Sequence, residues 1–318
     1  MATRRIRYAR LGTERANPRS HALDRMTPRE IATLMNREDR RAVLAVARVA
    51  RQIADAVQLI VASLRRGGRL FFVGAGTSGR LGVLEAAECP PTFGTPPRLV
   101  QAIIAGGRGS VFRSREGAED DARAARRAVR ARVRAGDVVV GVSASGVTPF
   151  VLAALAASRQ RGAATVLVAC NAGPAAAERL GRSSGSGPRK PQVRISPATG
   201  PEVLAGSTRL KAGTATKLVL NTLTTASMTG LGRVYGNRMV DLQPRSAKLR
   251  ERALRLVAEL GGVSRPRARA ALNASRRNVR LAIVMARSGL TAVEALRALA
   301  TAGGSLRTAL QNLPRTKR

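Results

Sequence analysis

Several kinds of residue are scarce in this chain, and each scarcity excludes a class of protein. Tryptophan is absent, aromatic residues make up 2% of the 318 residues, and there is one histidine. Proteins that bind single-stranded nucleic acid by base stacking need such aromatic side chains. The two cysteines, Cys89 and Cys170, lie far apart and form no C-x-x-C pair. This spacing excludes a disulfide framework and a zinc site, and we interpret both as reduced thiols.

Long apolar runs are also missing. The longest, such as LVQAIIAGG and TVLVAC, are far shorter than the roughly 20 residues of a membrane-spanning helix. The first residues, MATRRIRYARLGTERANPRS, contain no apolar core of a signal peptide. We therefore expect no membrane segment, no secretory signal and a cytoplasmic location. With a hydrophobic content of 44% and a mean hydropathy of -0.08, the chain can bury a substantial globular core.

Acidic residues are few beside the basic ones. The chain has 19 aspartates and glutamates against 56 lysines and arginines, for a net charge of +37. A surface of this charge attracts phosphate backbones. The arginines are spread along the whole chain, however, and no helix-turn-helix, zinc-finger or RNP motif is present. We expect incidental binding of nucleic acid at low salt and no specific nucleic-acid partner.

Short apolar segments predict five buried strands, with helical patterns between most of them. The strands are expected at 70–75, 100–105, 137–143, 165–170 and 192–198, and the helices at 79–88, 120–135, 148–161, 175–180 and 213–229. Apolar strands that alternate with helices indicate an α/β fold, with a mainly parallel sheet covered by helices on both faces. The sequence therefore predicts a three-layer α/β core.

Both ends of the chain are predicted to be helical. Thr27 precedes Pro28 and Glu30 in the pattern of an N-cap, and helices are expected at 28–37 and 39–65. After Pro244 the expected helices cover 246–260, 266–274, 276–287, 291–301 and 303–311. We predict an N-terminal segment with helices at 1–55, a central α/β domain at 56–245 and a small helical C-terminal domain at 246–318.

The stretch RLFFVGAGTSGR, residues 69–80, has glycines in the spacing G-x-G-x-x-G after a predicted strand. A dinucleotide site of this kind needs an acidic residue after the second strand to bind the ribose. The second strand here ends in IIAGGRGS, without a carboxylate. Thr77 and Ser78 instead offer hydroxyl groups at the start of a helix, where a phosphate or sugar oxygen binds well. We interpret the loop as half of a phosphate site.

A second loop, GVSASGVTPF at 141–150, places Ser143, Ser145 and Thr148 between a strand and a helix. Clustered hydroxyl groups and free backbone amides at a helix start form a phosphate cradle that needs no lysine. The alternative is that these residues act only as helix caps. The carboxyl ends of parallel strands meet at one edge, where open α/β sheets bind ligands, and this favours the phosphate site.

Together, GAGTSG and SASGVTP resemble the sugar isomerase (SIS) fold, whose phosphosugar sites use S-x-S-G-x-T. Four longer blocks sharpen the likeness: GAGTSGRLGVLEAAECPPTFGTPP (74–97), EGAEDD (116–121), GPEVLAGSTRLKAGTATKLVLNTLTTASM (200–228) and GRVYGNRMVDL (232–242). These blocks resemble the N-acetylmuramic acid 6-phosphate etherase family, and the similarity covers nearly the whole chain. It implies that 56–245 is an SIS phosphosugar-binding catalytic domain and that the protein is a homodimer.

The family reaction, as the resemblance implies, cleaves the C3 lactyl ether of N-acetylmuramic acid 6-phosphate during peptidoglycan recycling. The open-chain aldehyde makes the C2 proton acidic, so a base removes it and lactate leaves from C3. Water then adds back to give N-acetylglucosamine 6-phosphate and D-lactate. These steps need one base and one acid, and no metal or redox cofactor. The alternative on the same fold is a non-catalytic phosphosugar-binding regulatory protein.

Two carboxylates match the catalytic positions of the family. Glu88 in AAECPPT matches the proton donor, and Glu119 in EGAED is the candidate C2 base. Carboxylates at 116, 120 and 121 crowd Glu119, so the choice of base within 116–121 stays open. Retention of both positions argues against the regulatory alternative. The expected substrate-binding residues are Gly76, Thr77, Ser78, Ser143, Ser145, Thr148, Ser207, Thr208 and Lys211.

Two positions in the second loop depart from the family pattern. The family usually has arginine where this chain has Val147, and alanine where it has Ser143. Ser143 brings the loop closer to the wider SIS pattern, whereas Val147 removes a possible contact to an anion. The two changes bear on substrate preference, and both catalytic carboxylates are retained.

Overall fold

The chain divides into two compact units. The computed structural model describes residues 11–171, 191–244 and 246–313. The first unit comprises Met1–Ala86 and Arg98–Thr224, and the second comprises Ala87–Pro97 and Thr225–Arg318. The second unit thus includes 225–245 as well as the predicted C-terminal helices. The division of the chain at 55 and 245 stays a prediction.

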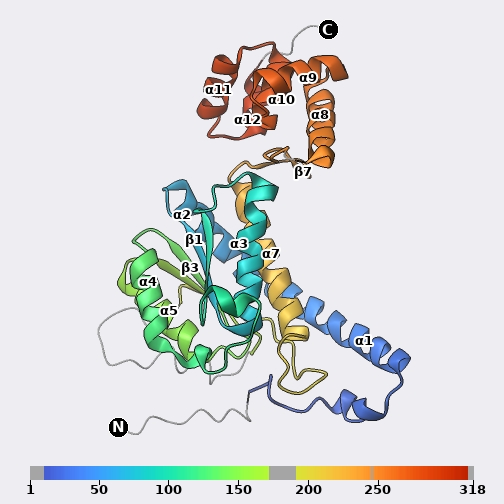
Figure 1. The fold of residues 1–318 in the computed structure, drawn as a ribbon, viewed down its shortest axis with the longest axis vertical. Helices are drawn as coiled ribbons and strands as arrows, with labels where there is room; N and C mark the ends of the chain where they lie inside the picture. The colour runs from blue at the N-terminus through green and yellow to red at the C-terminus, as the bar shows by residue number, and fades with distance from the viewer. Residues whose placement is uncertain (1–10, 172–190, 245, 314–318) are drawn as a thin grey trace. The chain divides into compact units, whose positions relative to one another are not determined.

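The first unit is built on a parallel sheet, part of which is labelled in Figure 1. The sheet has five strands in the order β2-β1-β3-β4-β5. The strands are β1 (Leu70–Gly74), β2 (Val100–Ile104), β3 (Val138–Val142), β4 (Ala164–Val168) and β5 (Val193–Ile195). Every residue of β1 and β3 is buried, as expected for central strands of a sheet covered on both faces. The predicted strands and their parallel arrangement are confirmed.

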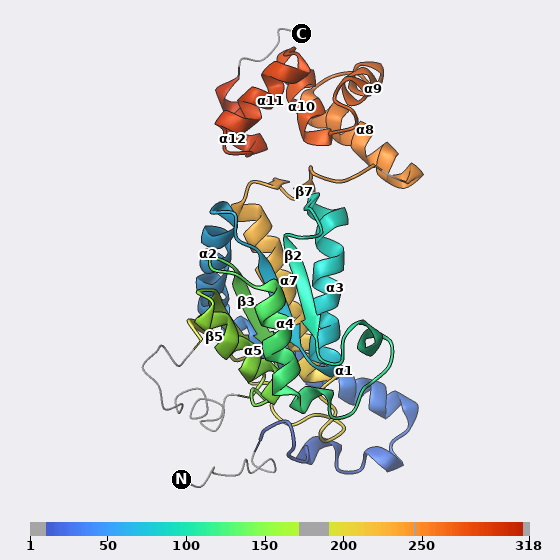
Figure 2. The same cartoon turned by 60° about the vertical axis from the view of Figure 1, so that its left-hand side comes forward.

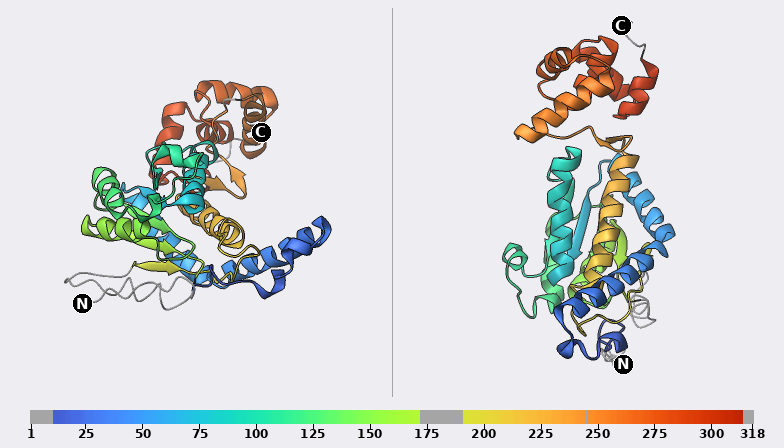
Figure 3. Two further views of the ribbon diagram at one scale, coloured as in Figure 1. Left: turned by 60° about the horizontal axis from the view of Figure 1, so that its bottom comes forward. Right: turned by 90° about the vertical axis from the view of Figure 1, so that its right-hand side faces the viewer.

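Helices cover both faces of this sheet, which gives three layers (Figure 2). On one face, α4 (Ala122–Arg132) and α5 (Pro149–Gln160) pack against the side chains of Phe71, Val73 and Val139. The right panel of Figure 3 shows α2 (Ala50–Arg65), α3 (Gly76–Phe93) and α7 (Lys211–Gly230) in the opposite layer. Gly82 lets α3 approach closely, because a Cβ atom there would lie 2.7 Å from the Cβ of Phe72.

The N-terminal helices divide at a different place from the predicted one. Thr27 and Glu30 form a capping box at the start of α1 (Pro28–Ala47), as the sequence indicates. Helix α1 continues through position 38, where the prediction had a break, and α2 begins at Ala50. No helix-breaking residue stands near 38, and Glu38 is buried in the middle of α1. The predicted bounds 28–37 and 39–65 are therefore wrong.

Two other helices also differ in length from their prediction. Helix α3 runs from Gly76 to Phe93, through Pro90 and Pro91, instead of ending at 88. Helix α4 is shorter than the predicted 120–135, because Asp121 caps its first turn. The helix predicted at 175–180 lies outside the described residues. Within the described ranges, no helix is both long and apolar enough to cross a membrane.

The second unit is helical, as predicted for the C-terminal part of the chain, and it also contains a short hairpin that was not predicted. Its helices are α8 (Ala247–Gly261), α9 (Arg265–Ala274), α10 (Val279–Ser288), α11 (Ala292–Thr301) and α12 (Leu306–Asn312), and its hairpin pairs β6 (Val234–Tyr235) with β7 (Arg238–Met239). Buried side chains such as Val257, Ile283 and Leu306 form its core. Gly262 and Gly289 end α8 and α10 in the left-handed conformation, which glycine adopts without strain.

Candidate active site

The order of the strands places two loops side by side at one edge of the sheet. Strand β1 pairs with β2 on one side and with β3 on the other, and Gly74 is in register with both Ile104 and Val142. The segments that follow β1 and β3 therefore begin at the same level. Such a reversal in strand order is where open α/β sheets bind their ligands. The hydroxyl residues predicted from the two motifs follow exactly these strands.

The loop after β3 is organised by its own hydroxyl groups. The Oγ of Ser143 lies 2.8 Å from the Oγ1 of Thr148 and accepts a hydrogen bond from the amide of Gly146 at 3.0 Å. The Oγ of Ser145 accepts one from the amide of Val147 at 3.3 Å. Ser143 is buried, whereas Ser145 and Thr148 are half-buried. The loop thus presents two accessible hydroxyl groups at the N-terminus of α5 and uses Ser143 to hold them.

The loop after β1 brings backbone and hydroxyl groups to the same edge. Gly74 and Gly79 approach so closely that a Cβ atom on Gly74 would lie 2.7 Å from the amide nitrogen of Gly79. Gly76 has a φ of +52°, in the left-handed region that favours glycine. Thr77 and Ser78 are half-buried in the first turn of α3. Among the described residues, neither hydroxyl is bonded, so both are free to bind a ligand.

The start of α7 lies against the first turn of α3. A Cβ atom on Gly213 would lie 3.5 Å from the carbonyl oxygen of Thr208 and 3.8 Å from the Cγ2 of Thr77. Ser207 and Thr208 are half-buried in the loop that leads into α7. These two predicted substrate-binding residues therefore lie near the loop after β1.

Two buried carboxylates fix the N-terminus of α7. Both oxygens of Glu202 accept backbone hydrogen bonds, from the amides of Lys211 and Ala212, each at 2.9 Å. Burial raises the pKa of Glu202, although these hydrogen bonds act in the opposite direction. A carboxylate at this position satisfies amides that the helix cannot pair internally. Glu202 therefore caps α7 from outside the helix.

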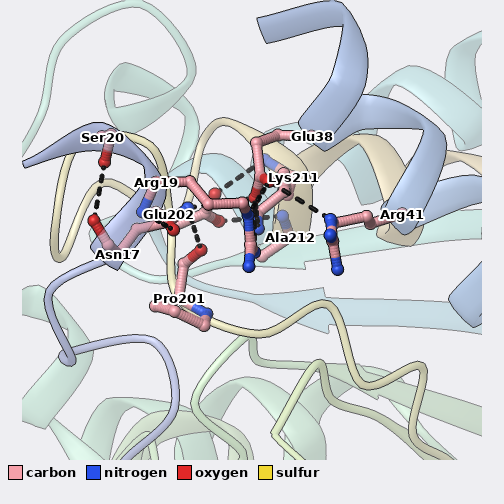
Figure 4. A network of polar contacts seen from close by, with 9 residues as sticks. All are labelled: Asn17, Arg19, Ser20, Glu38, Arg41, Pro201, Glu202, Lys211 and Ala212. Carbon is pink, nitrogen blue, oxygen red and sulfur yellow. Dashed lines mark hydrogen bonds and ion pairs between the residues drawn. The ribbon is translucent and has the colours of Figure 1, made fainter. Parts of the chain in front are cut away.

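The ammonium group of Lys211 binds Glu38 inside the protein (Figure 4). Its Nζ lies 2.5 Å from Oε2 of Glu38, and both side chains are almost fully buried. Glu38 also accepts hydrogen bonds from Arg19 at 2.6 Å and Asn17 at 3.0 Å, and pairs with Arg41 at 3.3 Å. Burial alone would raise the pKa of Glu38, but the hydrogen bonds from Arg19, Lys211 and Asn17 lower it from 4.5 to about 2. The substrate contact predicted for Lys211 stays a prediction, since every contact described for its side chain is structural.

Glu119 lies in a short 3-10 helix, η5 (Ala118–Asp120), that packs against α5. Its side chain is exposed, as are those of Glu116 and Asp120. Asp121 accepts a hydrogen bond from the amide of Ala124 at 2.8 Å and so caps α4. Asp121 therefore has a structural role. The candidates for the base in 116–121 are then Glu116, Glu119 and Asp120.

Glu88 lies in the last two turns of α3, and its side chain is exposed. It belongs to the second unit, whereas Glu119 and the two hydroxyl loops belong to the first. The neighbouring Glu85 is buried instead and accepts a hydrogen bond from Thr224 at 2.7 Å. Of the two carboxylates on this part of α3, Glu88 is the one available for chemistry.

Val147 fills an apolar position in the loop after β3. It is 3% exposed and packs against Leu11 of the N-terminal segment, which is 1% exposed. The contact accounts for an apolar residue here, and Val147 offers no group to an anion.

Sequence reasoning missed the carboxylates that hold α7. Glu38 lies four residues before Ala42 and seven before Ala45, so helical spacing places all three on the buried face of α1. A carboxylate on that apolar face could have indicated a buried ion pair. No local pattern points to Glu202, because it caps a helix that begins nine residues later.

The chain is similar to known proteins along most of its length. Residues 52–159 match the family model of the glucokinase regulatory protein N-terminal SIS domain. An N-acetylmuramic acid 6-phosphate etherase from Picosynechococcus sp. is 48% identical over 301 residues, which cover 94% of this chain and 96% of that protein. The etherase of Trichormus variabilis is 50% identical over 299 residues, covering 94% of each chain. Among solved structures, a phosphoheptose isomerase from Neisseria gonorrhoeae is similar with a TM-score of 0.47 and 20% identity, over 64% of this chain and 100% of that one.

The parallel sheet, its two hydroxyl-rich loops and the matching family model define a protein of the SIS type. The sequence relatives narrow this class to one family. The chain belongs to the N-acetylmuramic acid 6-phosphate etherase family, whose members are carbon–oxygen lyases.

Proposed function

We propose that this protein binds the phosphate of N-acetylmuramic acid 6-phosphate at the edge of the sheet and releases D-lactate from the sugar, in the cytoplasm. The observation that carries the proposal is the pair of hydroxyl loops after β1 and β3. Thr77, Ser78, Ser145 and Thr148 offer donors at the starts of α3 and α5, where helix dipoles favour an anion. Ser143 positions the second loop through Thr148.

The proposed chemistry is an elimination followed by addition of water. Glu119 takes the C2 proton, a double bond forms between C2 and C3, and the C3–O bond breaks. Glu88 gives its proton to the departing lactate oxygen. Water then adds across the double bond, with its oxygen at C3 and a proton at C2, so a hydroxyl group replaces the ether at C3. Each carboxylate acts as a general acid or base, which carboxylates do well when they reach the reacting atoms.

A homodimer is part of this proposal. Glu88 stands twelve residues after Gly76 in α3, which at the helical rise of 1.5 Å per residue is about 18 Å along the helix. The phosphate donors at the start of α3 and the acid in its last turns are too far apart to contact one sugar. We propose that Glu88 of one subunit acts in the site of the other subunit. In a dimer with two-fold symmetry this contact would occur twice, once for each site.

Lactate release from N-acetylmuramic acid 6-phosphate, with exchange of the C2 proton in deuterated water, tests the two roles. Glu88→Gln is expected to abolish lactate release while C2 exchange persists. Glu119→Gln is expected to abolish both. Glu116→Gln is the matched control, since it changes an exposed carboxylate of the same cluster. If Glu116→Gln stops exchange and Glu119→Gln does not, the base is assigned to the wrong residue.

Mixing the two inactive variants tests the shared site. Unfolding and refolding Glu88→Gln with Glu119→Gln gives mixed dimers in which one of the two sites has both carboxylates. Activity is then expected to return to about a quarter of the native value. No recovery, with dimers of mixed composition present, would mean that each site takes both carboxylates from one chain.

The regulatory alternative makes a different prediction. A phosphosugar sensor would bind N-acetylmuramic acid 6-phosphate and release no lactate. The wild-type assay separates the two functions directly.

A further inference from the structure

We propose that the second unit contains a separate binding pocket for a small phosphorylated metabolite, formed by four arginines around the start of α10. This site goes beyond the proposed etherase function, since none of its residues was predicted to act on the ether substrate. A cavity, the charge of its lining and the backbone at two of the arginines point to this site.

The cavity has a volume of about 420 Å³, within the size range of small-molecule sites. Its lining comes entirely from the second unit, and most of the lining side chains are polar or charged. Among them are Arg233, Asp241, Gln243, Arg276, Arg277 and Arg280. The cavity is larger than a bare phosphate needs, so the ligand that suits it carries a polar organic part such as a sugar.

The charge of the lining is not balanced by the protein. Asp241 is the one acidic residue among those that line the cavity. Its Oδ1 pairs with Nε of Arg280 at 2.8 Å and its Oδ2 pairs with Nη1 of Arg233 at 3.3 Å. Arg233 also donates to the carbonyl oxygen of Phe93 at 3.0 Å, and Arg280 donates to that of Gly304. Each oxygen of Asp241 is thus paired with one arginine. Arg276 and Arg277 have no acidic partner among the residues that line the cavity.

Arg276 and Arg277 are held in a conformation that arginine seldom adopts. Their φ angles are +52° and +64°, and they are the two non-glycine residues with positive φ in the described part of the chain. Each such residue strains the backbone, and residues of this kind cluster at functional sites. Both side chains are exposed, and among the described residues neither forms a hydrogen bond or ion pair. Glycine would relieve the strain, so the presence of arginine at both positions needs another reason.

A phosphate ester supplies that reason. Guanidinium groups bind phosphate oxygens through paired, charge-assisted hydrogen bonds. Four arginines against one aspartate leave a net charge of about +3 in a concave site, which matches a dianionic phosphate. A nucleic-acid backbone is a poorer match, because two of the four arginines are largely buried in the wall of the cavity.

The absence of tryptophan from the chain makes a local reporter possible. Gln243 is half-buried in the lining of the cavity, so Gln243→Trp places a single indole there. The full-length protein with this reporter is titrated with glucose 6-phosphate in 0.15 M salt, and with glucose as the neutral control. A saturable change in fluorescence with the phosphate ester alone is expected.

Arginine variants in the reporter background decide where binding takes place. Arg276→Gly with Arg277→Gly is expected to weaken binding at least tenfold and to leave the melting temperature within a few degrees, because glycine tolerates positive φ. Arg267→Ala with Arg269→Ala removes the same charge from exposed positions of α9 and is expected to change binding less than twofold. Ser145→Ala, in the sheet-edge loop, is expected to leave the response unchanged.

Four results would overturn the proposal. The first three are a response without saturation, an equal loss in both double-arginine variants, and a loss in Ser145→Ala that matches the loss in Arg276→Gly with Arg277→Gly. The fourth is binding of a short DNA duplex that depends on Arg276 and Arg277 while glucose 6-phosphate gives no response, which would replace this site with a nucleic-acid surface. Lactate release is measured on the same variants, so a fault in the etherase assignment is seen separately.

Discussion

Replacing Lys211 with methionine tests whether the buried network around Glu38 holds α1 and the N-terminal segment to α7. The change keeps an unbranched apolar stem of similar size and removes the ammonium group. Glu38 is 1% exposed and Lys211 is fully buried, so no water can replace the lost ammonium group. Arg19 and Arg41 remain near the carboxylate, but their own side chains are about half exposed.

Removing one partner of a buried ion pair costs about 3–5 kcal/mol, because the other charge is left without compensation. A domain of roughly 150–250 residues loses about 2–4 °C in melting temperature for each kcal/mol. The melting temperature of Lys211→Met is therefore expected to fall by about 6–20 °C. Replacing both charges leaves neither member of the buried pair without its partner, although Arg19 and Asn17 lose their bonds to Glu38. Glu38→Met with Lys211→Met is therefore expected to lose less than the sum of the single variants.

Thermal and urea denaturation followed by circular dichroism measure these differences. Lys217→Met is a matched control on the same helix, since Lys217 is exposed. A loss below about 1 kcal/mol in Lys211→Met, or full additivity in the double variant, would refute the role given to this ion pair.

Three further outcomes are expected. The lowered pKa of Glu38 stabilises the folded protein by about 3 kcal/mol. This stabilisation is complete above pH 4.5 and is lost as the pH falls toward about 2. Acid unfolding of the wild type beside Glu38→Gln measures it, and parallel curves of stability against pH would contradict it. Gly79→Ala is expected to destabilise the protein by about 1–3 kcal/mol, since its Cβ would lie 2.6 Å from Cγ1 of Ile104; unchanged urea unfolding would show that the contact relaxes. Cys170 is buried, burial raises its pKa to about 12, and Cys89 is buried as well; a thiol reagent at pH 8 is expected to label neither until the protein unfolds, and rapid labelling of the native state would contradict this.

The sheet could be predicted from the sequence because its strands carry their own signal. A strand that is buried on both faces is a continuous apolar run, as in β1 and β3, and such a run is recognised by the glycine or serine at its end. The ends of the helices were less predictable. Pro90 and Pro91 suggest that α3 stops near 88, since proline costs a helix interior about 3 kcal/mol. The helix nevertheless continues, with Cys89 and Phe93 both buried.

The candidate site shows the same contrast between local and distant information. Thr77 and Ser145 follow directly on strands, so their place at the edge of the sheet could be read from spacing. The burial of Lys211 could not, because its partner Glu38 lies 173 residues away in the chain. A separation of that size appears in no local pattern, and only packing of α1 on the start of α7 brings the pair together.

The pairing of β1 with β3 has a consequence for folding. Strand β2 and helices α3 and α4 lie between these neighbours in the chain, so the two hydroxyl loops meet only after a distant pairing has formed. Such a pairing closes a large loop, which costs entropy, and folds with many distant contacts form slowly. A phosphosugar that touches both loops would recognise the completed sheet and not its separate segments. At a concentration 100 times its dissociation constant, such a ligand raises the free energy of unfolding by about 2.7 kcal/mol. The substrate would therefore also stabilise the sheet that binds it.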